Sequence, residues 1–255
     1  MKFYKYQGTG NDFVLIDNRD LSFPKDAKFV GYLCDRRFGI GADGLILLEN
    51  DENPEVDFKM VYYNSDGNES TMCGNGGRCI VAFAHFLNVF ESKTTFNAID
   101  GLHEAEINGP IVKLKMIDVE SISSYNDSFV LNTGSPHFVK YINGIEDFDV
   151  FSNGREIRNS EDFVKEGINV NFIEKLSEDE VFVRTYERGV EDETYSCGTG
   201  VTACALTVFK NSDLNELKIK VLGGNLKVYA DKAGEGFTNV WLEGPATPVF
   251  SGEIK

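Results

Sequence analysis

A pair of short motifs occurs twice in this 255-residue chain at one constant spacing. Residues 9–14 read Thr-Gly-Asn-Asp-Phe-Val and residues 133–139 read Thr-Gly-Ser-Pro-His-Phe-Val, while residues 73–76 read Cys-Gly-Asn-Gly and residues 197–200 read Cys-Gly-Thr-Gly. Residue 133 minus residue 9 and residue 197 minus residue 73 both equal 124. Two motifs that repeat at one offset predict two copies of a single structural unit, each with one cysteine at a glycine-rich turn.

Strand-like and helix-like stretches alternate in both copies. A run of apolar residues on nearly all sides follows each Cys-Gly turn, and a helix with that pattern is buried. The sequence therefore predicts an α+β fold of two pseudo-symmetric domains, each a strongly curved sheet wrapped around a central helix. The strands expected are residues 12–17, 45–48, 58–63 and 181–186, and the helices are residues 78–90 and 201–209.

Composition excludes several classes of function. The formal charge of −16 would repel a phosphate backbone, so no nucleic-acid partner is expected. No apolar run has the length of a membrane span, and residues 1–12 lack the apolar segment of a secretory signal. Five cysteines without a short framework spacing indicate free thiols in a reducing cytoplasm. The three histidines lie in no zinc motif, so no metal is expected.

A cysteine at the start of a helix has a specific chemical consequence. The unpaired N–H groups of the first turn carry partial positive charge, which favours the thiolate and can bind a carboxylate. Two such helix starts that face each other would hold one carboxylate and flank its α-carbon with two thiols. One thiol would remove the α-proton and the other would supply a proton from the opposite face. Donors aimed at the carboxylate would stabilise the carbanion, so no cofactor is expected.

Several other motifs have both a functional and a purely structural interpretation. Residues 39–44 spell Gly-x-Gly-x-x-Gly, but a charged segment precedes them and a β-like run follows, so they are interpreted as a loop near the cleft rather than as a dinucleotide site. His137 is expected in a turn, with a role in the cleft or as a satisfied polar residue. Glu187 and Arg188 end a strand before Cys197 and are expected at the substrate rather than as a surface ion pair. Three further cysteines are expected to be buried packing residues: Cys34, Cys79 and Cys204.

Taken together, these motifs resemble the diaminopimelate epimerase family along essentially the whole chain. The segments that carry the resemblance are residues 8–14, 37–44, 64–67, 72–78, 169–172, 186–189, 197–200 and 244–246. The resemblance implies an N-terminal half of residues 1–119, a C-terminal half of residues 120–244, and a terminal segment 245–255 that returns to the first half. It also implies a cytoplasmic isomerase that converts LL-2,6-diaminopimelate to its meso form without pyridoxal phosphate, in lysine and peptidoglycan precursor synthesis. The expected partner is a small-molecule substrate, and the assembly considered is a homodimer.

The resemblance also implies roles for individual residues. Cys73 and Cys197 would be the two acid/base groups. The substrate-binding set divides into donors for the reacting carboxylate (Gly74, Asn75, Gly198 and Thr199), neighbours of the reacting amino group (His137 and Glu187), and residues for the distal amino-acid end (Asn11, Asn64, Asn169 and Arg188). The sequence departs from many family members at two positions: Gly44 stands where glutamine is usual, and Ser135 stands where asparagine is usual.

Two other functions are compatible with the same residues. A cofactor-independent racemase of another amino acid, similar to proline racemase, would use the same pair of thiols, although the first turn of that group resembles Cys-Gly-His-Gly. A non-catalytic protein that binds a dicarboxylic ligand would need the two helix starts but neither thiol. Exchange of solvent deuterium into substrate separates an epimerase from a binding protein.

Overall fold

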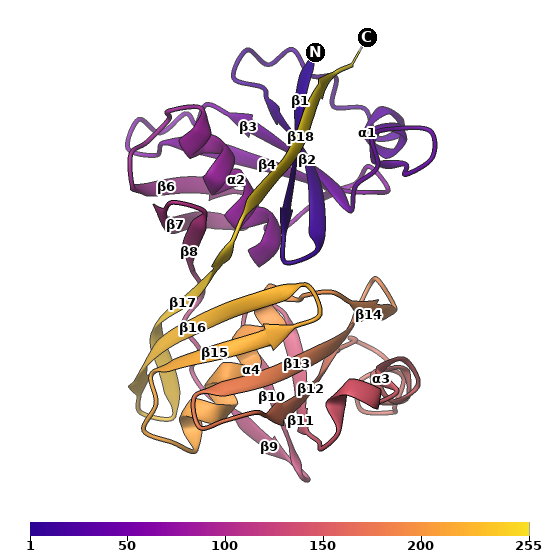
Figure 1. The fold of residues 1–255 in the computed structure, drawn as a ribbon, viewed down its shortest axis with the longest axis vertical. Helices are drawn as coiled ribbons and strands as arrows, with labels where there is room; N and C mark the ends of the chain where they lie inside the picture. Colours follow the sequence, from indigo (N-terminus) through magenta and orange to yellow (C-terminus); the bar gives the residue numbers. More distant parts are fainter. Residues whose placement is uncertain (255) are drawn as a thin grey trace. The chain divides into compact units, whose positions relative to one another are not determined.

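The computed structural model describes residues 1–254 and divides into two compact units (Figure 1). Unit 1 comprises Met1–Leu114 and the chain from Gly244 onward, and unit 2 comprises Lys115–Glu243. The sequence predicts crossings after residues 119 and 244, so the first crossing lies five residues earlier and the second one residue earlier. Residues 116–119 belong to unit 2 because Met116 N–H donates to the Val240 carbonyl (2.9 Å) and Val119 forms a β-bridge with Phe237.

Unit 1 is one sheet that curls around the helix α2. The sheet order is β18-β1-β2-β3-β4-β6-β7-β8, with parallel pairs at β2–β3 and β4–β6 and antiparallel pairs elsewhere. Helix α2 contacts the adjacent strands β1, β2 and β3 and also β7, which two strands separate from β3 in this order, so the sheet must wrap around the helix. The elements are β1 Lys2–Gly8, β2 Asn11–Asp17, α1 Ala27–Cys34, β3 Gly44–Glu49, β4 Phe58–Asn64, β5 Glu69–Ser70, α2 Gly74–Phe86, β6 Lys93–Ala98, β7 Gly101–Asn108, β8 Ile111–Lys115 and β18 Thr247–Glu253.

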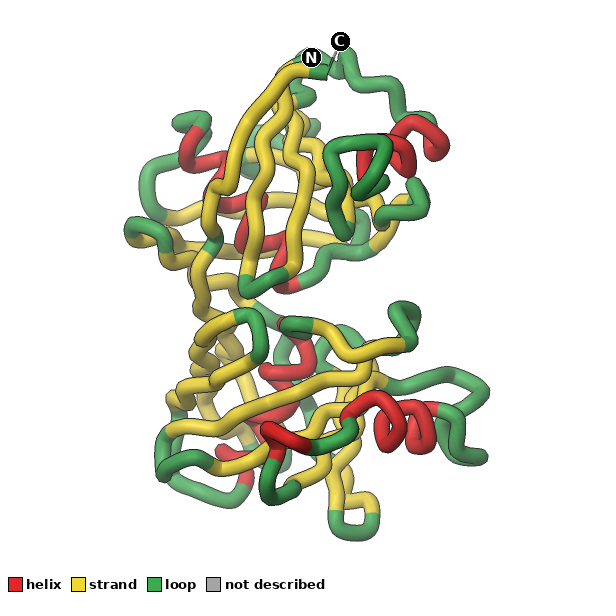
Figure 2. Tube along the Cα trace, turned by 45° about the vertical axis from the view of Figure 1, so that its right-hand side comes forward, coloured by secondary structure: helices red, strands yellow, loops and turns green. Residues whose placement is uncertain are grey.

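Unit 2 repeats the design around the helix α4. Its order is β9-β10-β11-β12-β13-β15-β16-β17, again with two parallel pairs, β11–β12 and β13–β15. Figure 2 shows the central helix of each unit (red) enclosed by strands (yellow). The elements are β9 Ser123–Tyr125, β10 Ser128–Asn132, β11 Pro136–Tyr141, η1 Ile145–Asp147, α3 Val150–Arg158, β12 Asn169–Lys175, β13 Glu180–Glu187, β14 Asp192–Thr194, α4 Gly198–Lys210, β15 Glu216–Val221, β16 Gly224–Ala233 and β17 Gly236–Pro245.

The sequence repeat is a repeat of the fold. Helices α2 and α4 have 13 residues each, and both ends of α4 lie 124 positions after those of α2, since 74 becomes 198 and 86 becomes 210. The predicted fold class is therefore confirmed. The predicted strands lie within β2, β3, β4 and β13.

The helix boundaries predicted from sequence were wrong at both N-terminal ends and at the C-terminal end of α2, which lies at Phe86 rather than at residue 90. Helix α2 begins at Gly74 rather than at residue 78, and α4 begins at Gly198 rather than at residue 201. Glycine usually marks a turn, but at Gly77 close packing requires a glycine inside the helix. A Cβ on Gly77 would lie 2.8 Å from Met72 Sδ and 2.9 Å from Leu114 Cδ2. The glycines of the first turn thus serve contact with the sheet rather than backbone flexibility.

A similar close contact fixes α3 against the sheet of unit 2 and provides a test of the packing. A Cβ on Gly154 would lie 2.7 Å from Tyr186 Cγ, and Tyr186 is 1% exposed. We expect Gly154→Ala to lower the free energy of unfolding by about 1–3 kcal/mol through overpacking, against the gain in helix propensity of about 1 kcal/mol. The control is Glu156→Ala at an exposed position of the same helix. Urea denaturation that shows Gly154→Ala to be more stable than the wild type would contradict this packing.

Candidate active site

Cys73 caps the N-terminus of α2. Its backbone is extended (φ −105°, ψ 147°), and its Sγ accepts a hydrogen bond from Gly76 N–H at 3.2 Å. The first turn of α2 contains no acidic residue that would neutralise the helix end. The sulfur therefore lies where the helix dipole favours negative charge.

Asn75 and Asn11 extend this helix start into a polar cluster. Asn75 Nδ2 donates to Asn11 Oδ1 (3.3 Å), and Asn11 Nδ2 donates to Asp43 Oδ2 (2.6 Å). Arg36 clamps both acids, with contacts of 2.7 Å to Asp12 Oδ1 and to Asp43 Oδ1. Burial opposes ionisation of Asp12, but hydrogen bonds from Arg36 and Lys5 outweigh it and hold its pKa well below the usual value. The charged network thus fixes Asn11.

Asn64 and Gly44 lie at the same end of the neighbouring strands as Asn11, since Asn11 begins β2, Gly44 begins β3 and Asn64 ends the antiparallel β4. Gly44 is in register with Phe13 of β2 on one side and with Asn64 of β4 on the other. The backbone of Asn64 closes the following turn through Asn68 and Gly67, at 2.9 Å in both cases. A Cβ at Gly44 would lie 2.6 Å from the ring of Tyr62 and 2.6 Å from the Tyr63 carbonyl oxygen, so a larger residue here would require both the ring and the backbone of β4 to move.

Cys197 occupies the corresponding cap of α4 but makes different contacts. No side-chain hydrogen bond caps this helix, and Cys197 Sγ lies 3.5 Å from Thr199 Oγ1. Thr133 Oγ1 donates to the Thr199 carbonyl at 2.8 Å, which holds the first turn to the loop before β11. A Cβ on Gly200 would overlap Asn171 Oδ1 and would lie 3.3 Å from Cys197 Sγ, so Asn171 lies under the helix start.

His137 is not in a turn, and that prediction was wrong. It lies in β11, is 0% exposed, and pairs in the ladder with Asn169, because the strand begins directly at Pro136.

Asn171 Nδ2 donates to the Phe138 carbonyl (2.9 Å) and lies 3.1 Å from His137 Nδ1. Nδ1 must therefore accept, and the proton of the neutral ring resides on Nε2. Nε2 has no hydrogen-bond partner within residues 1–254. Burial, with a smaller effect of Arg188, lowers the pKa of His137 to about 3.

Arg188, Asn169 and Ser135 form a second polar cluster of unit 2. Asn169 Nδ2 donates to Ser135 Oγ (2.9 Å), and Asn169 Oδ1 accepts from Arg188 N–H (2.9 Å). The guanidinium of Arg188 donates to the Glu166 carbonyl (3.0 Å) and to Ser135 Oγ (3.4 Å). Glu187, one residue earlier, accepts from Thr194 Oγ1 at 3.0 Å. Ser135 therefore takes part in the cluster although it differs from the usual asparagine.

Each unit thus contains one set of the predicted residues. Unit 1 holds Cys73 with Gly74, Asn75, Asn11 and Asn64, and unit 2 holds Cys197 with Gly198, Thr199, His137, Asn169, Glu187 and Arg188. Sequence reasoning missed the supports behind both sets: Asp43, Arg36, Asn171 and the buried Arg78. The importance of Asp43 could have been inferred from the sequence, because it lies in the conspicuous Gly-x-Gly-x-x-Gly segment of residues 39–44.

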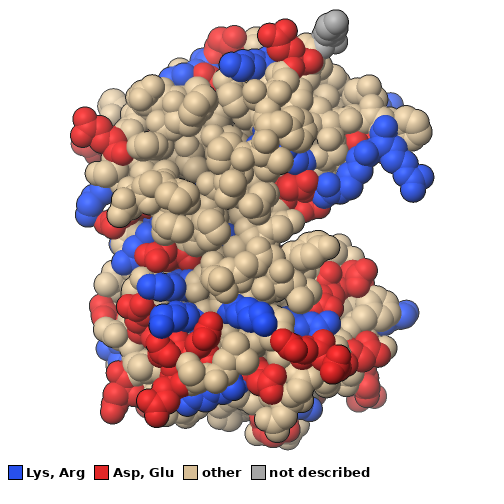
Figure 3. Space-filling model, in the orientation of Figure 1, with Lys and Arg blue, Asp and Glu red and all other residues tan. Residues whose placement is uncertain are grey.

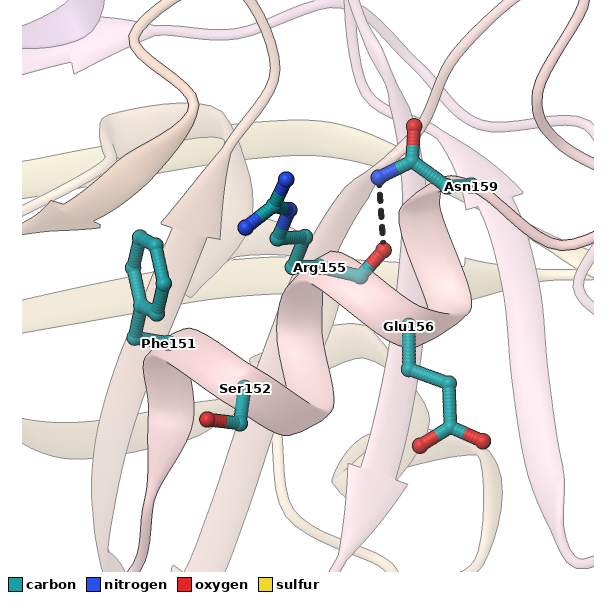
Figure 4. A pocket seen from close by; sticks show the side chains of 5 residues that line it. All are labelled: Phe151, Ser152, Arg155, Glu156 and Asn159. Atoms are coloured by element: carbon teal, nitrogen blue, oxygen red, sulfur yellow. Dashed lines mark hydrogen bonds between the residues drawn. The ribbon is translucent and has the colours of Figure 1, made fainter.

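Other surface features do not contribute to these sets. A shallow hollow on α3 is lined by Phe151, Ser152, Arg155, Glu156 and Asn159, none of them a predicted site residue (Figure 4).

Within residues 1–254, no cluster of three or more His, Cys, Asp or Glu side chains could hold a metal ion. No helix of these residues has the length and apolar character needed to cross a membrane. On the face in Figure 3, the basic side chains of unit 2 are interspersed with acidic ones.

Because the folded-state pKa of His137 lies below the unfolded value, His137 should make stability depend on pH. Between about pH 6.5 and pH 3 the unfolded chain binds a proton that the folded protein excludes, so stability falls as the pH falls. From pH 7.5 to pH 5 we expect the wild type to lose about 2 kcal/mol more than His137→Gln. Urea denaturation at each pH measures the difference, with His85→Gln as the control for exchange of an exposed histidine. Parallel stability curves for His137→Gln and the wild type would rule out a neutral buried His137.

Comparisons with known proteins identify the family of the chain. The family model of diaminopimelate epimerase matches residues 3–117 and 129–248. The diaminopimelate epimerase of Flavobacterium psychrophilum is 54% identical, covering 100% of both chains, and that of Aquifex aeolicus is 40% identical, covering 100% of this chain and 98% of its own. The fold is similar to a phenazine biosynthesis protein of the PhzF family from Bacillus anthracis (TM-score 0.77, 14% identity, 100% and 99% coverage). It is also similar to a probable proline racemase from Agrobacterium radiobacter (TM-score 0.70, 13% identity, 100% and 92% coverage). This chain belongs to the diaminopimelate epimerase family, whose members are isomerases that act on an amino acid.

Proposed function

We propose that this protein converts LL-2,6-diaminopimelate to the meso form with Cys73 and Cys197 as the two acid/base groups and without a cofactor. The observation that carries the proposal is the duplicated helix start: each unit presents a cysteine as the N-cap of a buried 13-residue helix. A protein that only bound a dicarboxylate would need the helix ends but no sulfur at either one. The family relationship supports the substrate.

The reaction is a proton exchange at one carbon. One thiolate removes the α-proton, and the electron pair of the broken C–H bond passes into the substrate carboxylate. The other thiol then protonates the carbon from the opposite face, so that one thiolate and one thiol exchange roles in each turnover. N–H groups of Gly74, Asn75, Gly198 and Thr199 would stabilise the charge that develops on the carboxylate.

The remaining residues would select the substrate. Glu187 would accept hydrogen bonds from the reacting ammonium group, and a neutral His137 beside it would add no repulsive positive charge. Arg188 would bind the distal carboxylate with the help of Asn169, Asn11 and Asn64, because a guanidinium pairs two N–H donors with two oxygens. The product would serve lysine and peptidoglycan precursor synthesis in the cytoplasm, which the family relationship and the odd number of cysteines support.

The function is tested by proton exchange without added cofactor. Diaminopimelate incubated with the protein in D₂O should gain deuterium at the α-carbon and interconvert between isomers, as measured by mass spectrometry and chiral separation. Proline, hydroxyproline and glutamate serve as competing substrates. Exchange into one of these amino acids alone would favour the racemase, and exchange into none would favour a binding protein.

The two-base mechanism predicts that each cysteine is necessary. Cys73→Ala and Cys197→Ala should each lower turnover of diaminopimelate by about 100-fold or more, since inversion needs an acid and a base. Cys34→Ala is the matched control, because it removes a thiol that is buried in unit 1 away from the helix starts. Near-normal turnover in either of the two active-site variants would refute the mechanism.

The role of Arg188 predicts a loss of substrate selection. Arg188→Lys should raise KM for diaminopimelate by about 10-fold or more, since lysine cannot present a planar pair of donors to a carboxylate. Arg184→Lys provides the control, because Arg184 forms a paired contact with Glu193 (2.6 and 2.7 Å) outside the predicted site. An unchanged KM for Arg188→Lys would make Arg188 a structural residue.

A further inference from the structure

The two units differ in the charged side chains that they bury. Unit 1 buries Lys5, Glu49 and Arg78. In unit 2, no lysine, arginine, aspartate or glutamate of Lys115–Glu243 is buried. The pseudo-symmetry of the fold therefore does not extend to its electrostatics.

Arg78 is the unusual member of this group. Lys5 pairs with Asp12 (2.8 Å) and Glu49 pairs with Lys25 (2.8 Å). Arg78 is 0% exposed, and no carboxylate in residues 1–254 pairs with it. Burial lowers the pKa of Arg78 to about 10, so the guanidinium is still protonated at neutral pH. A buried cation without a counter-charge is unfavourable, and a nearby anion would relieve it.

The partners of Arg78 place its charge at the helix start. Its side chain turns back along α2 and donates to the Gly74 carbonyl (3.1 Å) and to Asn75 Oδ1 (3.1 Å). It also donates to Thr9 Oγ1 (3.1 Å) and to the Pro245 carbonyl (3.4 Å). All four acceptors are neutral oxygens. Two thiols lie near enough to raise the pKa of Arg78 when ionised, Cys79 and, with a smaller effect, Cys73. Burial raises the pKa of Cys79 and keeps it protonated, so Cys73 is the thiol that the guanidinium can stabilise as a thiolate.

The equivalent position in unit 2 is uncharged. Residue 78 plus the repeat offset of 124 is Thr202, which is also 0% exposed. Thr202 Oγ1 donates to the Gly198 carbonyl at 2.9 Å, as Arg78 does to the equivalent Gly74 carbonyl. The two side chains therefore stabilise the same turn of the helix, and only one of them brings a positive charge to its cysteine.

We propose that the buried guanidinium of Arg78 makes Cys73 the thiolate of the resting enzyme and leaves Cys197 as the thiol. The inference rests on the proposed function and assigns the direction of its first step. In that step Cys73 takes the α-proton and Cys197 gives its own proton to the carbon. The enzyme then holds a Cys197 thiolate and a Cys73 thiol. Proton exchange with solvent restores the resting form, in which Arg78 is a positioning residue that does not touch the reacting atoms.

Other charges near the two helices do not reproduce this effect. Strands β1, β2 and β3, which pack against α2, bring the exposed Lys2 and four ion-paired residues, Lys5, Asp12, Asp17 and Glu49. Strand β7 brings His103 at 3.4 Å from Asp100, Glu106 at 2.7 Å from Lys93, and the exposed Glu104. Against α4, the buried histidine His137 is neutral at pH 7 because burial lowers its pKa to about 3. The strands around α4 bring no buried charged residue. Their charged residues are all half-buried or exposed: Lys140, Glu174, Lys175, Glu180, Arg184, Glu187, Glu216, Lys218, Lys220, Lys227, Asp231 and Lys232.

The test is the pH dependence of alkylation of each cysteine in the substrate-free protein. The full chain is treated with iodoacetamide between pH 5 and pH 10, and peptide mapping gives a separate rate for each thiol. In the wild type we expect the midpoint for Cys73 to lie about one pH unit or more below that for Cys197, because a nearby opposite charge stabilises a thiolate. A Cys197 midpoint at or below that of Cys73 would overturn the inference without any variant.

Three variants separate charge from packing. Arg78→Gln should move the Cys73 midpoint up by about one pH unit or more and leave that of Cys197 in place, whereas Arg78→Lys should keep the Cys73 midpoint low. Thr202→Val is the matched control, because it removes the equivalent hydrogen bond to Gly198 without a change of charge, and both midpoints should stay as in the wild type. A Cys73 midpoint that is unchanged in Arg78→Gln would contradict the role of the guanidinium. Should Arg78→Gln fail to fold, the order of the wild-type midpoints decides.

These outcomes are distinguishable from a failure of the proposed function. Alkylation needs no substrate, whereas the function is tested by exchange of the α-proton. A protein that epimerises diaminopimelate with Cys197 as the more acidic thiol would refute the inference alone. A protein with the expected thiol order but no exchange would refute the function alone.

Discussion

The first turn of each central helix must be buried against a curved sheet, and the rest of each unit depends on this constraint. Larger residues would meet neighbouring atoms at Gly76 and Gly77 of α2 and at Gly200 of α4. The backbone of each first turn can therefore lie close to its surroundings. A cysteine cap is compatible with this arrangement because its sulfur can accept an N–H of the turn, as Cys73 does from Gly76 at 3.2 Å.

Each helix start is held from outside by a different set of contacts. In unit 1, Asn75 connects the helix to Asn11, which Asp43 and Arg36 hold in turn. In unit 2, Thr133 binds the helix backbone and Asn171 lies below the first turn. The fold thus conserves the position of each thiol while the surrounding chemistry differs. A difference between the surroundings of the two thiols suits a reaction in which one group acts as an acid while the other acts as a base.

The main features of the fold could be predicted from the sequence because the repeat is nearly free of insertions between the two cysteine motifs. The offset of 124 applies to Cys73 and Cys197 and to both ends of α2 and α4. The starts of the helices could not be predicted, since glycine usually marks a turn and only the tertiary contacts show why it lies inside a helix. His137 was misplaced for a related reason, because a Ser-Pro pair normally favours a turn, yet Pro136 is the first residue of β11.

The supports of the site were hidden for a different physical reason. Arg78 lies in a stretch whose apolar residues predict a buried helix, and a charged residue there looks like an exposed exception. Only the structure shows that its side chain is folded back along the helix and is 0% exposed. The position of Asp43 likewise depends on the parallel pairing of β2 and β3, which local sequence does not encode. Residues that act through others therefore escaped detection, while residues with their own chemistry did not.

The return of the chain to unit 1 has a consequence for the order in which the protein matures on the ribosome. Strand β1 pairs with β2 on one side and with β18, the last strand, on the other, and the amino group of Met1 donates to the Ile254 carbonyl at 2.9 Å. Unit 2 ends at Glu243, so its own sheet does not need β18. Unit 1, although begun first, keeps one edge of β1 unpaired until β18 has emerged from the ribosome, and Arg78 gains its contact with Pro245 only when that segment is present. Unit 1 therefore waits for a segment that follows the whole of unit 2 in the chain, and until then the open edge of β1 is the surface that a chaperone would have to shield.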